Sequence, residues 1–136
     1  MDLYVIFYRY NHGEYYEVYW VGDNLEQGKT KYLEECKSFF KSGPDDLSQL
    51  WFEHFYNLTQ KEVNWLRSLV GLTGSKFSER DQLRFNKMFG SGWERNPRYI
   101  KNDVSVVYGD DFDDDISEFA DDYLTEYLKD MIDFND

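Results

Sequence analysis

Carboxylates at regular spacing are the residues of this chain best suited to a chemical role, and they lie near the C-terminus. The candidate side chains are Asp110, Asp111, Asp113, Asp114 and Asp115, followed by Glu118, Asp122, Glu126 and Asp130. On a helix, residues four apart share one face and lie ~6 Å apart along the axis. That step is close to the separation of successive phosphates along a nucleic-acid strand. We therefore expect these nine carboxylates to form a partner-binding surface that imitates phosphates.

The net charge of the chain is concentrated in the same region. Residues 1–102 contain 14 acidic and 14 basic side chains, whereas residues 103–136 contain 13 acidic side chains and one basic side chain, Lys129. A neutral body with one strongly negative element directs a positively charged partner to that element. The predicted partner is the basic groove of a nucleic-acid-binding protein. The alternative interpretation is a solvated face that only keeps the protein soluble.

The sequence around the carboxylates predicts a helix over residues 116–134. Apolar residues recur there at helical spacing. They are Ile116, Phe119, Ala120, Tyr123, Leu124, Tyr127, Leu128, Met131 and Ile132. The carboxylates spaced four apart lie on the opposite side, where like charges repel and cost a few tenths of a kcal/mol per pair. We expect the apolar stripe to pack on the body, so that this helix is integral to the fold.

The aspartates before this helix do not match a calcium-binding loop. If Asp111, Asp113 and Asp115 take the first ligand positions, Ile116 falls where the loop requires glycine and Asp122 falls where it requires a bidentate glutamate. Aspartates at a helix start are instead favoured as caps and by the helix dipole. No metal site and no cofactor are predicted.

A basic segment, residues 76–101, precedes the acidic one. Lys76, Arg80, Arg84 and Lys87 share one helical face, and aromatic residues are interleaved with them. Such a patch is typical of nucleic-acid binding, but the field of a protein with a net charge of −12 opposes the approach of nucleic acid. We expect these cations to pair with acidic residues of the same chain, and we predict no direct binding of nucleic acid.

No catalytic motif is present, and the chain is not predicted to be an enzyme. The sequence lacks a glycine-rich phosphate loop, H-E-x-x-H and G-x-S-x-G. His12 falls in a predicted turn, and His54 and the single cysteine, Cys36, fall on apolar stripes that predict buried positions. No secretion signal or membrane-spanning segment is recognised, so a cytoplasmic protein is expected.

The remaining pattern predicts an α+β fold in the order ββααααβα, formed by a single domain over residues 1–136. Strands are expected at 3–10, 15–21 and 104–108, and the first two form a tyrosine-rich hairpin. The helix starts are expected at Asp23 with Glu26, at Asp45, at Thr59 with Glu62, and at Ser78. The second of these helices would bury Leu47, Leu50, Trp51, His54, Phe55 and Leu58. Residues 93–98 are expected to be irregular because Asn96-Pro97 disfavours helix.

In size, charge placement and aromatic content the chain resembles the small acidic inhibitors that phages make against host defences, such as anti-CRISPR and DNA-mimic proteins. The resemblance implies a non-enzymatic inhibitor that acts in the host cytoplasm on a nuclease or another nucleic-acid-binding protein. Two alternatives remain open from the residues alone. One is an immunity protein that neutralises a basic toxin, and the other is a soluble structural or interaction domain. The binding surface is either the acidic helix or the tyrosine-rich hairpin.

Overall fold

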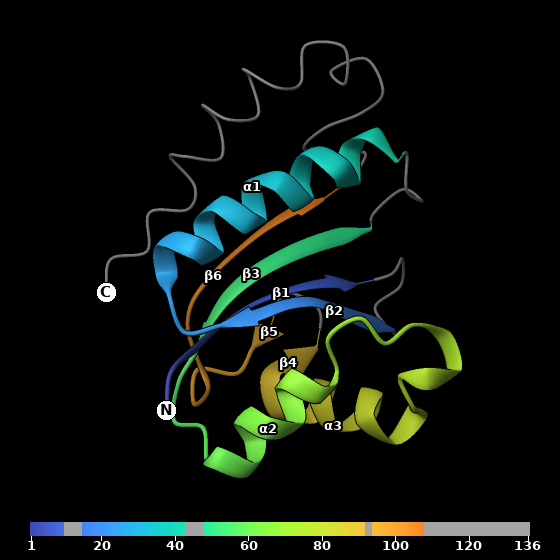
Figure 1. The fold of residues 1–136 in the computed structure, drawn as a ribbon. Helices are drawn as coiled ribbons and strands as arrows, with labels where there is room; N and C mark the ends of the chain where they lie inside the picture. Colours follow the sequence, from blue (N-terminus) through green and yellow to red (C-terminus); the bar gives the residue numbers. More distant parts are fainter. Residues whose placement is uncertain (10–14, 43–47, 92–93, 108–136) are drawn as a thin grey trace.

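The computed structural model of the chain, shown in Figure 1, describes residues 1–9, 15–42, 48–91 and 94–107. This part has an α+β fold built on a small antiparallel sheet, as expected. The sheet has four strands, and three α-helices are described. The elements follow in the order β1 (Leu3–Arg9), β2 (Tyr16–Gly22), α1 (Leu25–Lys41), β3 (Gln49–Phe55), α2 (Gln60–Ser68), a 3-10 turn (Gly74–Lys76), α3 (Glu79–Phe89), β4 (Gly90–Ser91), β5 (Glu94–Arg95) and β6 (Ile100–Val107).

The main sheet has the strand order β2-β1-β3-β6, and every neighbouring pair is antiparallel. The predicted N-terminal hairpin is therefore confirmed as β1 and β2, while its turn lies outside the described residues. β1 and β3 occupy the centre, and their register runs from Leu3 opposite Phe55 to Arg9 opposite Gln49.

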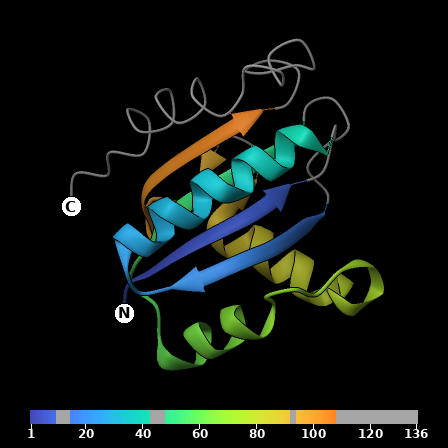
Figure 2. The same ribbon diagram turned by 45° about the horizontal axis from the view of Figure 1, so that its top comes forward.

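Helices cover both faces of the sheet. Helix α1 lies on one face, and α2 and α3 lie on the other (Figures 1 and 2). Because side chains alternate between the faces of a strand, Tyr4, Ile6 and Tyr8 of β1 pack toward α1, whereas Leu3 and Phe7 pack toward α2 and α3. Both faces of β1 are thus used for the core, so its tyrosines are not available as a binding surface.

The helix predicted to begin at Asp45 is wrong where the structure describes it, because residues 49–55 form strand β3. Every residue of β3 is buried. Leu50, Trp51, His54 and Phe55 were expected to share one helical face, but they alternate between the two core clusters or flank them. A central strand covered on both faces is an almost continuous apolar run, and periodicity cannot distinguish such a run from a buried helix.

The strand predicted at 104–108 begins earlier than expected and is the fourth strand of the sheet. Strand β6 spans Ile100–Val107, and Tyr108 lies outside the described residues. Its first half contains the exposed charged residues Lys101 and Asp103, so this half was not recognised as part of the strand from the sequence. Within the stretch 93–98, the described residues 94–98 are also more regular than expected, because β5 pairs with β4 in a short antiparallel ladder.

The helix caps largely agree with those predicted from the sequence. Thr59 and Glu62 form the expected capping box of α2, and the side chain of Ser78 caps α3. Helix α1 differs, because Asn24 and not Asp23 caps it, with Oδ1 accepting a hydrogen bond from the Gln27 N–H at 2.9 Å. Val70 lies beyond the end of α2 at Ser68, is 40% exposed and forms a bridge with Val18.

The predicted helix over 116–134 and all nine candidate carboxylates, Asp110 to Asp130, lie outside the described residues. The order ββααααβα is not matched: in the described part a strand replaces the second helix, and a short two-stranded ladder follows α3. Within the described segments, no helix is long and apolar enough to cross a membrane.

Candidate interaction surface on the third helix

Helix α3 is fixed to the sheet by its inner face. Phe85 and Phe89 are fully buried against the sheet core. The side-chain amide of Gln82 accepts a hydrogen bond from the Tyr16 N–H at 2.7 Å and donates one to the Tyr16 carbonyl at 2.9 Å. Because this amide satisfies both backbone groups of one β2 residue, it sets the rotation of α3 about its axis and determines which residues face outward.

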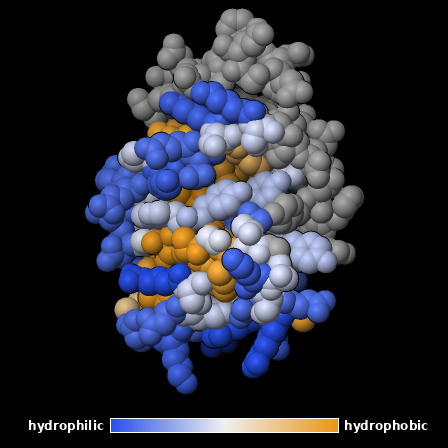
Figure 3. Space-filling model, turned by 45° about the vertical axis from the view of Figure 1, so that its right-hand side comes forward, coloured by the Kyte–Doolittle hydropathy of each residue, from blue (hydrophilic) through white to orange (hydrophobic). Residues whose placement is uncertain are grey.

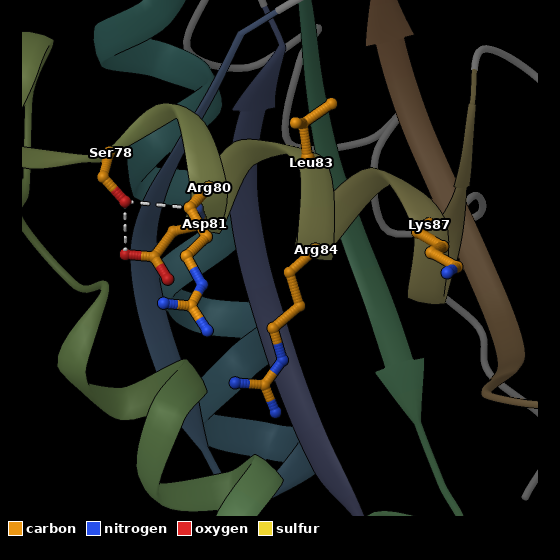
Figure 4. A pocket seen from close by; sticks show the side chains of 6 residues that line it. All are labelled: Ser78, Arg80, Asp81, Leu83, Arg84 and Lys87. Atoms are coloured by element: carbon orange, nitrogen blue, oxygen red, sulfur yellow. Dashed lines mark hydrogen bonds between the residues drawn. The ribbon is translucent and has the colours of Figure 1, made fainter.

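The outward side of α3 carries three cations and an exposed leucine around a shallow depression of about 700 Å³. Its lining consists of Ser78, Arg80, Asp81, Leu83, Arg84 and Lys87. In Figure 4, Arg80 and Arg84 extend to the same side of the helix, Leu83 leaves it on the other side, and Lys87 lies toward its C-terminal end. Hydrophilic side chains also project from the end of the molecule that α2 and α3 form (Figure 3).

Arg84 is held in place by helix α2. Its guanidinium lies over the indole ring of Trp65, 4.1 Å from the ring centre. The indole N–H of Trp65 in turn donates to Asp81 Oδ1 at 3.0 Å, and Asp81 Oδ2 accepts from the Ser78 hydroxyl at 3.0 Å. Trp65, Asp81 and Arg84 therefore form one connected unit between the two helices.

The expected pairing of the basic segment with acidic residues is not observed for α3 in the part that the structure describes. Lys76, Arg80, Arg84 and Lys87 form no ion pair with a described carboxylate. The aromatic residues interleaved with them do not share their face, since Phe77, Phe85 and Phe89 are buried, and Trp93 lies outside the described residues. Among the described residues, the cations thus form a basic surface without exposed aromatic rings.

One cation of the same segment is buried in an ion pair. Arg95 of β5 donates from Nε to Glu53 Oε2 at 2.7 Å and from Nη2 to Glu53 Oε1 at 2.5 Å. Its guanidinium also lies near the rings of Phe7 and Trp51 and donates to the Gly90 carbonyl. Burial raises the pKa of Glu53 from 4.5 to about 7, although the Arg95 charge opposes the shift. Sequence reasoning missed this pair, because it placed Glu53 on a helix and its partner in an irregular segment.

The remaining candidate side chains are parts of the core. Cys36 is fully buried, and burial raises the pKa of its thiol. His54 is buried as expected, but on a strand, and its Nε2 lies 3.1 Å from Asp2 Oδ2. His12 lies outside the described residues. In the described ranges, no group of three or more His, Cys, Asp or Glu side chains is arranged to hold a metal ion.

Comparisons with protein-family models, with curated proteins and with solved structures yield no match for this chain. The fold and the site define an α+β protein that has an antiparallel sheet covered by helices and an exposed basic face on helix α3. The nine candidate partner-binding carboxylates, Asp110 to Asp130, come after strand β6 in the sequence.

Proposed function

We propose that this protein is a non-enzymatic inhibitor that blocks the basic nucleic-acid-binding groove of a nuclease or another nucleic-acid-binding protein with its acidic C-terminal segment. One observation carries the proposal. Residues 1–107 contain 15 acidic and 14 basic side chains, whereas residues 108–136 contain 12 acidic side chains and one basic side chain. The body up to the end of β6 is nearly neutral, so the long-range field of the molecule comes from the segment that follows it.

In the proposed complex, carboxylates take the places of phosphates. The principal groups are Glu118, Asp122, Glu126 and Asp130, assisted by the aspartates from Asp110 to Asp115. Lysine and arginine side chains that bind phosphates also bind carboxylates in charge-assisted hydrogen bonds. A preformed row of such groups would exclude the nucleic acid from the groove. The chain resembles anti-CRISPR and DNA-mimic inhibitors in size, charge placement and aromatic content, and we extend the mimicry of DNA to this chain as part of the proposal.

The described hairpin supports the acidic segment over the tyrosine-rich surface as the principal binding element. Tyr4, Tyr8 and Tyr16 are buried, and Tyr15 is the most exposed tyrosine of the described hairpin residues, at 55%. One exposed ring can add an apolar contact at the margin of an interface. It does not provide the cluster of buried anchors that dominates binding energy in most interfaces.

The test compares two variants that lose the same number of negative charges. The first replaces Glu118, Asp122, Glu126 and Asp130 with glutamine or asparagine. The control makes the same change at four exposed acidic residues of the body, Asp23, Glu34, Glu79 and Glu94. Proteins captured from a host lysate at low and moderate salt are identified, and the purified partner is then titrated with all three proteins.

We expect the first variant to bind the partner far more weakly than wild type, because several partner cations lose their charged counterparts at once. The control should bind as wild type does, and the partner's own nucleic acid should displace the wild-type protein. Equal affinities of the first variant and wild type, or simultaneous binding of inhibitor and nucleic acid, would refute the proposal.

A further inference from the structure

We propose that the outer face of α3 is a second interaction surface, which binds an acidic helical segment of a partner protein. The surface consists of Arg80, Leu83, Arg84 and Lys87. This inference rests on the geometry of the described residues and does not depend on the proposed role of the acidic segment. The positive charge of the surface is the first observation that supports the inference. None of its three cations has an ion-pair partner among the described carboxylates.

The spacing of the cations fits a helix lying alongside α3. Arg80 and Arg84 are four residues apart and Lys87 follows three residues later, which gives axial steps of ~6 Å and ~4.5 Å. At about 100° per residue, the three Cα positions fall within roughly 60° of the circumference. Carboxylates spaced three and four residues apart on a partner helix would repeat the same steps. The charges would therefore meet in register over two turns.

Arg84 is already held in a fixed position before any partner binds. Its guanidinium is stacked on Trp65, whose indole N–H is bound to Asp81. Immobilising a long side chain costs conformational entropy on binding, and a preorganised side chain avoids part of that cost. A stacked guanidinium still presents the N–H groups at its edge, which suit a carboxylate. Asp81 partly offsets the positive charge of the surface, but its oxygens already accept two hydrogen bonds.

The apolar component favours a protein over a nucleic acid. Leu83 is 67% exposed and lines the depression from the side of α3 opposite to Arg80 and Arg84 (Figure 4). An amphipathic acidic helix can cover it with an apolar residue, whereas unpaired bases are held mainly by stacking on aromatic rings. The lining contains no aromatic residue, and the Trp65 ring is covered by Arg84. The net charge of −12 also opposes a polyanion more strongly than it opposes a peptide with a few carboxylates.

The probe for this surface is a short, fluorescently labelled synthetic helix that carries glutamates and leucines at matching spacing. The fluorescence anisotropy of this probe is measured with the protein comprising residues 1–136 at low and high salt. The test variant is Arg80→Gln, Arg84→Gln and Lys87→Gln combined. The control removes three lysines of α1, through Lys29→Gln, Lys31→Gln and Lys37→Gln. A second test variant is Leu83→Ala, which leaves all charges in place.

We expect the α3 triple variant to lose about tenfold or more in affinity for the probe, given the usual contributions of several exposed ion pairs. The α1 control should stay within about twofold of wild type, because α1 lies on the opposite face of the sheet from α3. Leu83→Ala should weaken binding with an unchanged salt dependence. The proposal is overturned by undetectable probe binding, by an equal loss in the α1 control, or by tighter binding of an oligonucleotide than of the acidic probe.

Discussion

Glu53 and Arg95 are 42 residues apart in the chain and form a two-pronged ion pair beneath helix α3. Glu53 is fully buried in the central strand β3, and the Arg95 side chain is only 5% exposed. The pair joins the sheet to the short ladder of β4 and β5. Gly90 contributes to the same junction: its φ is +101°, and a Cβ there would lie 2.2 Å from the Glu94 carbonyl oxygen.

Removal of one partner of this pair should be strongly destabilising. Glu53→Met leaves the buried Arg95 guanidinium without its hydrogen-bond acceptors, and Arg95→Met leaves the Glu53 carboxylate buried without its counter-ion. Loss of one partner of a buried pair typically costs about 3–5 kcal/mol. Replacement of both residues by methionine should recover much of the loss, because a buried pair can often be exchanged for apolar residues of similar volume. Urea unfolding of the two single variants and the double variant measures this. A double variant as unstable as the worse single variant would contradict the expectation.

The stability contributed by Glu53 should depend on pH. Its pKa in the folded protein is raised from 4.5 to about 7, so the folded state retains a proton that the unfolded state releases between these values. The stability of the wild type relative to Glu53→Gln should therefore fall as the pH rises through this interval and stay constant above it. Urea unfolding of both proteins at about pH 5 and about pH 8 tests the sign. Because both proteins share all other carboxyl groups, the comparison isolates the contribution of Glu53. A relative stability that rises with pH would contradict the raised pKa of Glu53.

Gln82 should contribute more to stability than a polar helix residue usually does, because its amide is buried against β2. Gln82→Ala would leave the buried Tyr16 N–H and carbonyl without their partner, and such a loss costs ~1–3 kcal/mol per unsatisfied group. Gln60→Ala is the control, because the Gln60 amide bonds only to the exposed Asn64. Thermal unfolding should show a clearly lower midpoint for Gln82→Ala and little change for the control. Similar midpoints would mean that the contact with Tyr16 is not important.

The protein comprising residues 1–136 should not bind DNA or RNA at physiological salt, despite the basic face of α3. Release of counterions favours such a complex only where enough cations reach the backbone, and here the net field of the chain is repulsive. Titration of labelled single-stranded and duplex oligonucleotides should therefore give no complex. Micromolar binding that weakens steeply with salt would make α3 a nucleic-acid site.

Local features of this protein could be predicted from its sequence, because the interactions that cause them lie within a few residues. The capping box of Thr59 and Glu62, the Ser78 cap and the β1–β2 hairpin are of this kind. The buried position of Cys36 also followed from helical periodicity. The separation of a neutral body from an acidic segment is a property of the sequence alone, and it carries the proposed function.

Other features were decided by tertiary structure. Strand β3 could not be recognised because helices cover both faces of the sheet, which removes the alternation that identifies a strand. The Glu53–Arg95 pair and the stacking of Arg84 on Trp65 join residues far apart in sequence, so no local pattern encodes them. The sequence places Arg80, Arg84 and Lys87 on one face of a helix. Only the packing of Gln82, Phe85 and Phe89 turns that face toward solvent.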